Sequence, residues 1–121
     1  MMRFHVISIF PKAFDSYLGE SLFRRAREKK ILAVKTYDLR DFSNDRHRKV
    51  DDRPFGGGPG MVLKVQPIED ALAAVERGIG RRRGRKLRKR TILFSARGGK
   101  FDAAAARRLA RYDDIVMVCG R

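Results

Sequence analysis

The residues best suited to chemistry are concentrated in 50-VDDRPFGGGPGM-61, where two aspartates and an arginine precede four glycines in five positions. Glycine loses more conformational entropy on ordering than any other residue, and it lets the backbone take positive φ or approach another molecule closely. A tight turn between two elements needs only one or two such residues. The run therefore predicts a functional loop whose backbone lies against a ligand, in preference to a simple turn.

Glycine-rich loops often bind nucleotide phosphates, but two such patterns are excluded here by spacing. The Walker pattern requires a lysine and then serine or threonine after its last glycine, whereas Gly60 is followed by Met61 and Val62. The dinucleotide fingerprint G-x-G-x-x-G also fails, because the sixth position counted from Gly56 is Met61 and from Gly58 is Leu63. A phosphate-binding nucleotide hydrolase is therefore disfavoured.

The segment before the glycines, 41-DFSNDRHRKVDDRPF-55, alternates acidic and basic residues. Its arginines and lysine could bind phosphates, and its carboxylates could accept hydrogen bonds from base or ribose groups. The alternative is a solvated loop held by its own ion pairs, each worth about 0 to 1 kcal/mol. His47 has no second histidine or cysteine at metal-ligand spacing, so we predict no metal site.

The net charge of +15, from 29 basic and 14 acidic residues, is the strongest global signal. Such a field attracts phosphate polyanions with a salt-sensitive affinity. Anionic membrane surfaces would call for a basic amphipathic helix with large apolar residues on its other face, and the sequence contains no convincing one. Nucleic acid is the favoured partner, and no membrane segment is predicted. The single cysteine, Cys119, excludes an internal disulfide and fits a reducing cytoplasm; we expect it to be a buried apolar residue.

The pattern of apolar residues predicts one α/β domain over residues 1–121, with a largely parallel sheet flanked by helices. A strand, a helix and a second strand fall within the first forty residues and form a βαβ unit. A long loop, 40–60, follows, and the basic stretch 78–90, with eight Lys or Arg among thirteen residues, is expected to be a mobile surface loop. The predicted strands are 3–10, 31–39, 91–95 and 115–120. One predicted helix begins at Phe14, and two others span 66–77 and 103–111.

Residues 41-DFSNDRHRKVDDRPFGGGPGMVLKVQPI-68 resemble the signature of the bacterial tRNA (guanine-37, N1)-methyltransferases, knotted SPOUT-class enzymes that use S-adenosylmethionine. The segments 7-ISIFPKAFDSYL-18, 93-LFSARGGKFD-102 and 116-VMVCGR-121 match as well, so the resemblance runs from Phe4 to Arg121. It implies methyl transfer to N1 of guanine 37 in a tRNA whose position 36 is also guanine. It further implies a trefoil knot around the cofactor and a homodimer with shared sites.

The resemblance also implies roles for individual residues. The segment 94–98 and the last glycine would contact the cofactor, the glycine run and its flanks would lie near the target guanine, and the start of the charged segment would face the tRNA. The implied cofactor residues are Phe94, Ser95, Ala96, Arg97, Gly98 and Gly120, and the implied substrate residues are His47, Arg48, Asp51, Arg53, Pro54, Gly56, Gly57, Gly58 and Gly60.

These residue types suit the reaction that the resemblance implies. Guanine N1 carries a proton and is a poor nucleophile, so its methylation needs a base and stabilisation of the negative charge that grows on O6. Backbone N–H groups bared by glycines and the guanidinium of Arg53 could supply that stabilisation. Holding the methyl donor in line with N1 would supply the rest.

The sequence departs from the family pattern at two points. Ala96 stands where the family most often has proline, which should cost only some rigidity. The family's chains also continue beyond C-G-R into the threading segment, an aspartate proposed as the base, and a helical domain that grips tRNA. We therefore expect this chain to be a truncated form with an incomplete cofactor edge and little or no activity alone. The alternative is a noncatalytic, basic RNA-binding module, and the role of 78–90, auxiliary tRNA contact or solvated insertion, stays open.

Overall fold

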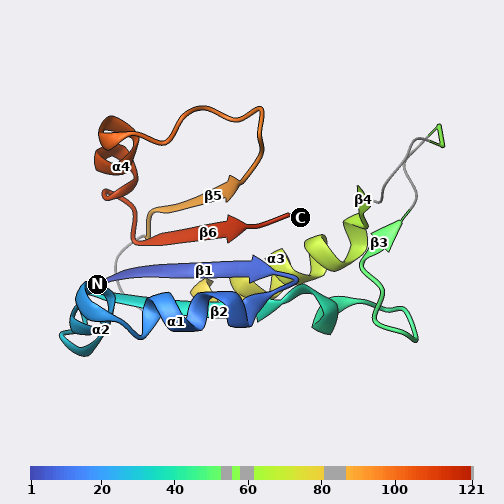
Figure 1. The fold of residues 1–121 in the computed structure, drawn as a ribbon, viewed down its shortest axis with the longest axis horizontal. Helices are drawn as coiled ribbons and strands as arrows, with labels where there is room; N and C mark the ends of the chain where they lie inside the picture. The colour runs from blue at the N-terminus through green and yellow to red at the C-terminus, as the bar shows by residue number, and fades with distance from the viewer. Residues whose placement is uncertain (53–55, 58–61, 81–86, 121) are drawn as a thin grey trace.

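The computed structural model describes residues 1–52, 56–57, 62–80 and 87–120. Its centre is a four-stranded sheet in the order β2-β1-β6-β5, in which every neighbouring pair is parallel (Figure 1). This confirms the predicted α/β class with a parallel sheet. The strands are β1 (Met2–Ser8), β2 (Leu32–Asp38), β5 (Lys89–Leu93) and β6 (Asp114–Val118).

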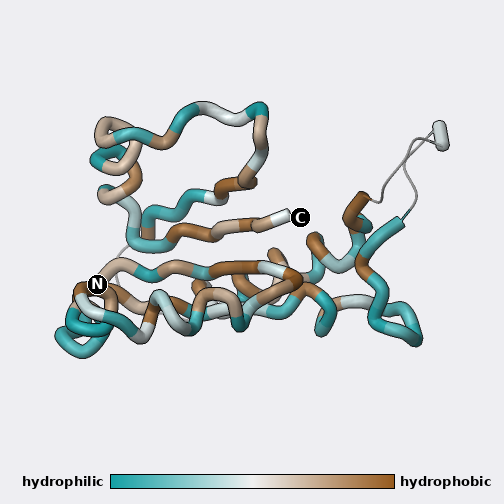
Figure 2. The backbone as a smooth tube through the Cα atoms, in the orientation of Figure 1, coloured by the Kyte–Doolittle hydropathy of each residue, from teal (hydrophilic) through white to brown (hydrophobic). Residues whose placement is uncertain are grey.

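The core lies between the central strands and helix α3 (Val65–Gly80). Ala71, Val75 and Ile79 follow one another at a spacing of four residues, so they form one buried stripe along the helix. That stripe belongs to the same buried cluster as Ile7 of β1 and Val116 of β6. In Figure 2, β6 is brown over most of its length, whereas β1 is brown only in its second half and carries hydrophilic positions in its first half.

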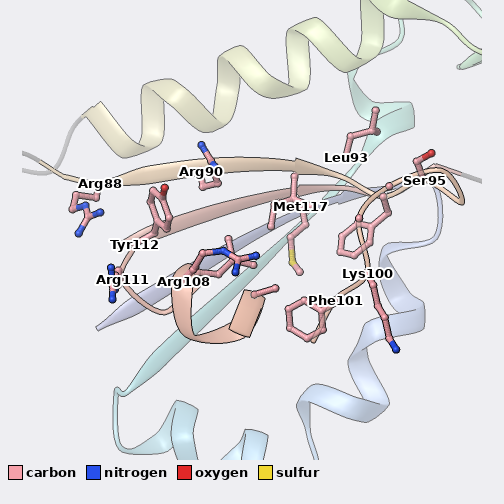
Figure 3. Close-up of a pocket in the computed structure, with 16 residues that line it drawn as sticks. Arg88, Arg90, Leu93, Ser95, Lys100, Phe101, Arg108, Arg111, Tyr112 and Met117 are labelled. Carbon is pink, nitrogen blue, oxygen red and sulfur yellow. The ribbon is translucent and has the colours of Figure 1, made fainter. Parts of the chain in front are cut away.

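Helix α4 (Ala103–Leu109) lies on the opposite side of β5 and β6 from α3 (Figure 3). Its first turn is fixed by Asp102, whose Oδ1 accepts a hydrogen bond from the N–H of Ala105 at 2.8 Å. Helix α4 is the predicted helix 103–111, shorter by two residues.

The helix predicted to begin at Phe14 is broken into three pieces, so that prediction was wrong in its continuity. The pieces are η1 (Pro11–Phe14), α1 (Asp15–Leu18) and α2 (Ser21–Glu28). Helix α1 ends when the N–H of Gly19 donates to the carbonyl of Asp15, and Ser21 then takes a positive φ of 45°. Tyr17 and Leu22 of the predicted apolar face are 76% and 75% exposed, so this face is not buried within the chain.

The two predicted loops contain more regular structure than their composition indicated. Loop 40–60 begins within η2 (Leu39–Phe42) and is anchored by the buried side chains of Leu39 and Val50. Within the basic stretch 78–90, the first three residues continue α3 because Ile79 extends its buried stripe, and the last two begin β5. Residues 81–86 lie outside the described part of the chain, and the proposed role of the stretch is untested.

A buried polar pair joins β1 to β6. Nε2 of His5 lies 2.8 Å from Oδ1 of Asp114, and both side chains are buried. A carboxylate only accepts hydrogen bonds, so Nε2 is the donor. Within the described residues Nδ1 of His5 has no hydrogen-bond partner.

Cys119 is a free thiol just past the end of β6 and is half-buried rather than fully buried. Burial raises the pKa of the Cys119 thiol above its usual value of 9.0. Because the thiolate is the nucleophilic form, the reactive fraction at neutral pH is smaller than for an exposed cysteine.

Across the described ranges, no helix is long and apolar enough to cross a membrane. The same part of the chain contains no group of three or more His, Cys, Asp or Glu side chains placed to hold a metal ion.

Candidate functional site

A cavity of about 710 Å³ opens between β5, β6, α4 and the loop that joins β5 to α4 (Figure 3). Its wall is mainly apolar and comes from all of these elements. Figure 3 shows Met117 of β6 pointing from the sheet toward Phe101, which precedes α4. The other apolar side chains on the wall include Ile92, Leu93, Phe94 and Leu109.

The loop after β5 is shaped by a tight turn at Ser95. The hydroxyl Oγ of Ser95 accepts from the N–H of Arg97 at 3.1 Å, and its carbonyl accepts from the N–H of Gly98 at 3.1 Å. A Cβ atom at Gly98 would lie 3.3 Å from that carbonyl oxygen, whereas one at Gly99 would meet nothing within 4 Å. Glycine at position 98 therefore allows the turn to close tightly.

The six residues implied for the cofactor do not all lie together. Phe94, Ser95 and Gly98 line the cavity, so the structure brings these three into one place. Ala96 and Arg97 are exposed on the turn and are not among the lining residues. Gly120 follows β6 and lies beside Leu63, where its Cβ would be 4.0 Å from Cδ1 of that leucine.

The glycine run lies between β3 (Asp51–Asp52) and β4 (Val62–Leu63), which pair antiparallel. The pair is extended by a hydrogen bond from the N–H of Lys64 to the carbonyl of Val50 at 2.6 Å. Gly56 and Gly57 are exposed and have φ values of 82° and 77°. These values lie in the left-handed region that glycine adopts readily, as predicted for this run. The predicted substrate residues Arg53, Pro54, Gly58 and Gly60 lie outside the described residues.

Asp45 organises the segment that carries His47 and Arg48. Its Oδ2 accepts from the N–H groups of His47 at 2.8 Å and Lys49 at 3.2 Å. The side chains of His47 and Arg48 are both exposed. Arg48 has a positive φ of 57°, and its guanidinium forms an ion pair with Asp41. The turn therefore presents the two residues that were predicted to face the tRNA.

The backbone hydrogen bonds from Lys49 and then His47 lower the pKa of Asp45 below its usual value of 3.8. Because the pKa of Asp45 is lower in the folded chain, the ionised carboxylate stabilises the fold, and this contribution is fully present at pH values above the pKa of the unfolded chain. It is lost as the pH falls through the folded value.

We expect the ¹³C resonance of the Asp45 carboxyl group to titrate at a lower pH in the folded chain than in the chain unfolded by urea, because only the folded carboxylate accepts these two N–H groups. NMR titration of both states measures the difference. Equal midpoints would contradict the turn described here.

The two candidate regions share one end of the sheet. Loop 94–101 leaves the carboxyl end of β5, Gly120 follows the carboxyl end of β6, and Leu63 of β4 lies beside Gly120. Ligands of open parallel sheets bind beyond the carboxyl ends of the strands. The cavity and the glycine hairpin therefore flank the edge where such a ligand is expected.

The sequence did not predict that α4 forms one wall of this cavity, or that four arginines line its end away from Ser95. These are Arg88, Arg90, Arg108 and Arg111. Arg88 lies just before β5 and Arg90 lies within it, while Arg108 lies in the last turn of α4 and Arg111 lies two residues beyond it; all four line the cavity. These positions were readable in the sequence, but nothing there indicated that β5 and α4 lie across one cavity.

The chain was compared with known families and structures. The model of the family described as tRNA (Guanine-1)-methyltransferase TrmD matches residues 2–121. A tRNA (guanine-N(1)-)-methyltransferase from Geobacter metallireducens is 44% identical over 120 residues, which are 99% of this chain and 46% of that protein. A relative of the same name from Heliobacterium modesticaldum is also 44% identical, with 99% and 44% covered.

The crystal structure of the tRNA (m1G37) methyltransferase from Aquifex aeolicus has the same fold, with a TM-score of 0.85 and 32% sequence identity. It covers 99% of this chain and 51% of the crystallised one. The present chain thus spans about half the length of the curated relatives it matches. The family match extends over the strands, the glycine hairpin and the cavity loop alike, and the chain therefore belongs to the tRNA (guanine-1)-methyltransferase family.

Proposed function

We propose that this chain takes part in S-adenosylmethionine-dependent methylation of N1 of guanine 37 in tRNA, in the cytoplasm. The observation that carries the proposal is the position of the cavity and the glycine hairpin, which flank the carboxyl edge of a parallel sheet in a chain matched by the family model from residue 2 to 121. One region would hold the methyl donor and the other the target guanine.

The cavity suits the adenosyl part of the cofactor. Its apolar side chains offer a surface for an adenine ring, and the turn at Ser95 brings the backbone close to the opening. We assign Phe94, Ser95 and Gly98 to cofactor binding, with Ala96, Arg97 and Gly120 as residues implied by the family resemblance. When bound, S-adenosylmethionine supplies an electrophilic methyl group on a sulfonium centre.

The residues of the hairpin would act on the guanine. The positive φ values of Gly56 and Gly57 support a loop whose N–H groups are accessible to O6, where negative charge develops as N1 loses its proton. Arg53 would add a guanidinium, and Asp51, Pro54, Gly58 and Gly60 would complete the wall. His47 and Arg48 would contact the tRNA outside the base. No residue of this chain is assigned as the general base.

We further propose that residues 1–121 taken by themselves bind the cofactor weakly and turn over little. Phe94 is half exposed and Ala96 and Arg97 are exposed, so the loop leaves much of a bound cofactor in contact with water. The exposed apolar residues Tyr17 and Leu22 support the homodimer that the resemblance implies, because association would cover them.

Calorimetry with S-adenosylmethionine tests the cofactor assignment through two matched variants. We expect Gly98→Ala to weaken binding about tenfold, because the new Cβ crowds the carbonyl of Ser95 and shifts the turn. Gly99→Ala should change affinity less, since its Cβ meets nothing within 4 Å. Equal effects of the two substitutions would argue against a cofactor held by this turn.

Transfer of a labelled methyl group tests the substrate. A tRNA with guanine at positions 36 and 37 should be methylated slowly, and the same tRNA with adenine at position 37 should not be methylated at all. If the chain binds tRNA with a steep salt dependence and shows no cofactor binding in the calorimeter, the noncatalytic RNA-binding module replaces the enzyme as the proposal.

A further inference from the structure

Four arginines gather at the end of the cavity that lies farthest from the turn at Ser95. Arg88 lies just before β5 and Arg90 lies in its second position, while Arg108 lies in the last turn of α4 and Arg111 lies two residues beyond that helix (Figure 3). Tyr112 lies among them, and the guanidinium carbons of Arg88 and Arg90 are 5.3 and 5.6 Å from the centre of its ring. We call these four side chains the arginine cluster.

The guanidinium groups of the cluster have no acidic side-chain partner among the described residues, although the carboxylate of Asp113 accepts a hydrogen bond from the backbone N–H of Arg88 at 2.9 Å. None of the four guanidinium groups forms an ion pair or a side-chain hydrogen bond with any residue in the described ranges, although Lys89, between two of them, pairs with Glu76 on the other face of β5. Gathering like charges costs energy unless an anion is nearby. The arrangement therefore favours a polyanionic ligand.

Stabilisation of the carboxyl end of α4 by basic side chains explains only part of the arginine cluster. Basic residues in the last turn of α4 interact favourably with its carbonyl ends, which accounts for Arg107 and Arg108. It does not account for Arg88 and Arg90, which lie just before and within β5 and have their guanidinium groups held over Tyr112. Contacts with an aromatic face restrain both side chains and so reduce the entropy lost when they bind a ligand.

The cluster is also separate from the proposed methyl-transfer site. It lies where β5 begins and α4 ends, whereas the glycine hairpin and Ser95 lie toward the carboxyl ends of the strands. Five residues of β5 separate the two ends, a length of about 16 Å. A ligand that reaches both must be larger than one nucleotide.

We propose that the arginine cluster binds the phosphodiester backbone of the RNA substrate at a second contact, away from the target guanine. The inference rests on the proposed function for the identity of the RNA. Guanidinium groups bind phosphate oxygens through paired hydrogen bonds, and the ring of Tyr112 holds two of them in place. Backbone contacts position a nucleic acid without reading its sequence, so the contact does not depend on which base occupies position 37.

The test measures tRNA affinity by fluorescence anisotropy at several salt concentrations, with purified chain and labelled tRNA. The variant R88Q/R90Q/R108Q/R111Q removes the whole cluster. The variant R108Q/R111Q removes only the two arginines at and just after the end of α4, and leaves β5 unchanged. The control K12Q/R25Q/K29Q/K30Q removes the same total charge from exposed positions in and around η1 and α2.

We expect the fourfold cluster variant to lose at least about tenfold in affinity near physiological salt and to lower the salt slope by about 3 to 3.5, since each of the four lost phosphate contacts removes roughly 0.7 to 0.9. The variant R108Q/R111Q should lose about half as much in the logarithm of the affinity and about half as much in the salt slope. Guanine and adenine at position 37 should give the same losses. If the control loses as much affinity as the cluster variant, the effect comes from net charge alone and the proposal fails.

Two further outcomes separate this inference from the proposed function. Cluster-dependent tRNA binding in a chain that shows no S-adenosylmethionine binding would leave the cluster standing and overturn the methyltransferase proposal. Cofactor binding together with unchanged tRNA affinity of the cluster variants would overturn the cluster alone. If the variants keep tRNA affinity but lose binding to phosphatidylglycerol vesicles, the cluster binds a membrane surface instead, and the proposal is wrong.

Discussion

Replacing His5 with alanine is expected to lower the free energy of unfolding by about 2 to 4 kcal/mol. The hydrogen bond from Nε2 of His5 to Asp114 has a charged acceptor, and such bonds contribute about 1.5 to 3 kcal/mol. Both side chains are buried, so the lost imidazole also leaves a gap between β1 and β6 that the surrounding strands can fill only in part. Urea unfolding followed by circular dichroism measures the change.

The chain supplies a matched control, because its only other histidine, His47, is exposed. His47→Ala should change the free energy of unfolding by no more than about 0.5 kcal/mol, since its side chain is solvated. Its expected effect is on tRNA affinity instead. If His5→Ala and His47→Ala unfold at the same urea concentration, the buried pair does not stabilise the sheet and the pairing of β1 with β6 would need another explanation.

Replacing Ile7 with alanine is expected to cost about 2 to 5 kcal/mol of unfolding free energy, the range measured for large aliphatic side chains in cores. Ile7 is 0% exposed and lies near the carboxyl end of β1, where it pairs with β2 on one side and β6 on the other, and it belongs to the same cluster as Val75 of α3. No exposed edge is close enough for the core to collapse into the space left by the side chain. The same urea measurement gives the loss.

Ile31→Ala is the control, because it removes the same atoms from a side chain that is 60% exposed. It should cost well under about 1 kcal/mol, as surface substitutions usually do. A loss for Ile7→Ala no larger than for Ile31→Ala would show that α3 does not close over the sheet as described.

The apolar pattern of the sequence predicted the sheet class and most elements correctly because central parallel strands must be apolar on both faces. The run from Ile115 to Val118 of β6 meets that condition, whereas β1 meets it only in part because His5 and Ser8 are polar. Helix α3 was predicted from Ile68, Leu72 and Val75, but its end was placed too early, since Gly78 and Gly80 read as loop residues while the burial of Ile79 favours another helical turn. Tertiary packing overrides local propensity at such ends.

The break in the first helix could not be predicted from spacing. The positions from Phe14 to Ala26 fit a helical face, but α1 ends at the backbone hydrogen bond from Gly19 to Asp15 and Ser21 takes a positive φ, and the spacing of apolar residues registers neither. The candidate site divides in the same way. The glycine hairpin was recognised from composition, whereas the cavity wall from Ile92, Phe101 and Met117 exists only because α4 folds back over β5 and β6.

Among the residues that the structure describes, β5 is an outer strand of the sheet, with β6 as its neighbour on one side. An outer strand presents a row of backbone N–H and C=O groups that a second chain could extend into a larger sheet, and lysine and arginine side chains are a common protection against such association. Three successive basic residues, Arg88, Lys89 and Arg90, stand where β5 begins. The charges that we propose to bind RNA would thus also disfavour the edge-to-edge pairing of two copies of the chain at β5.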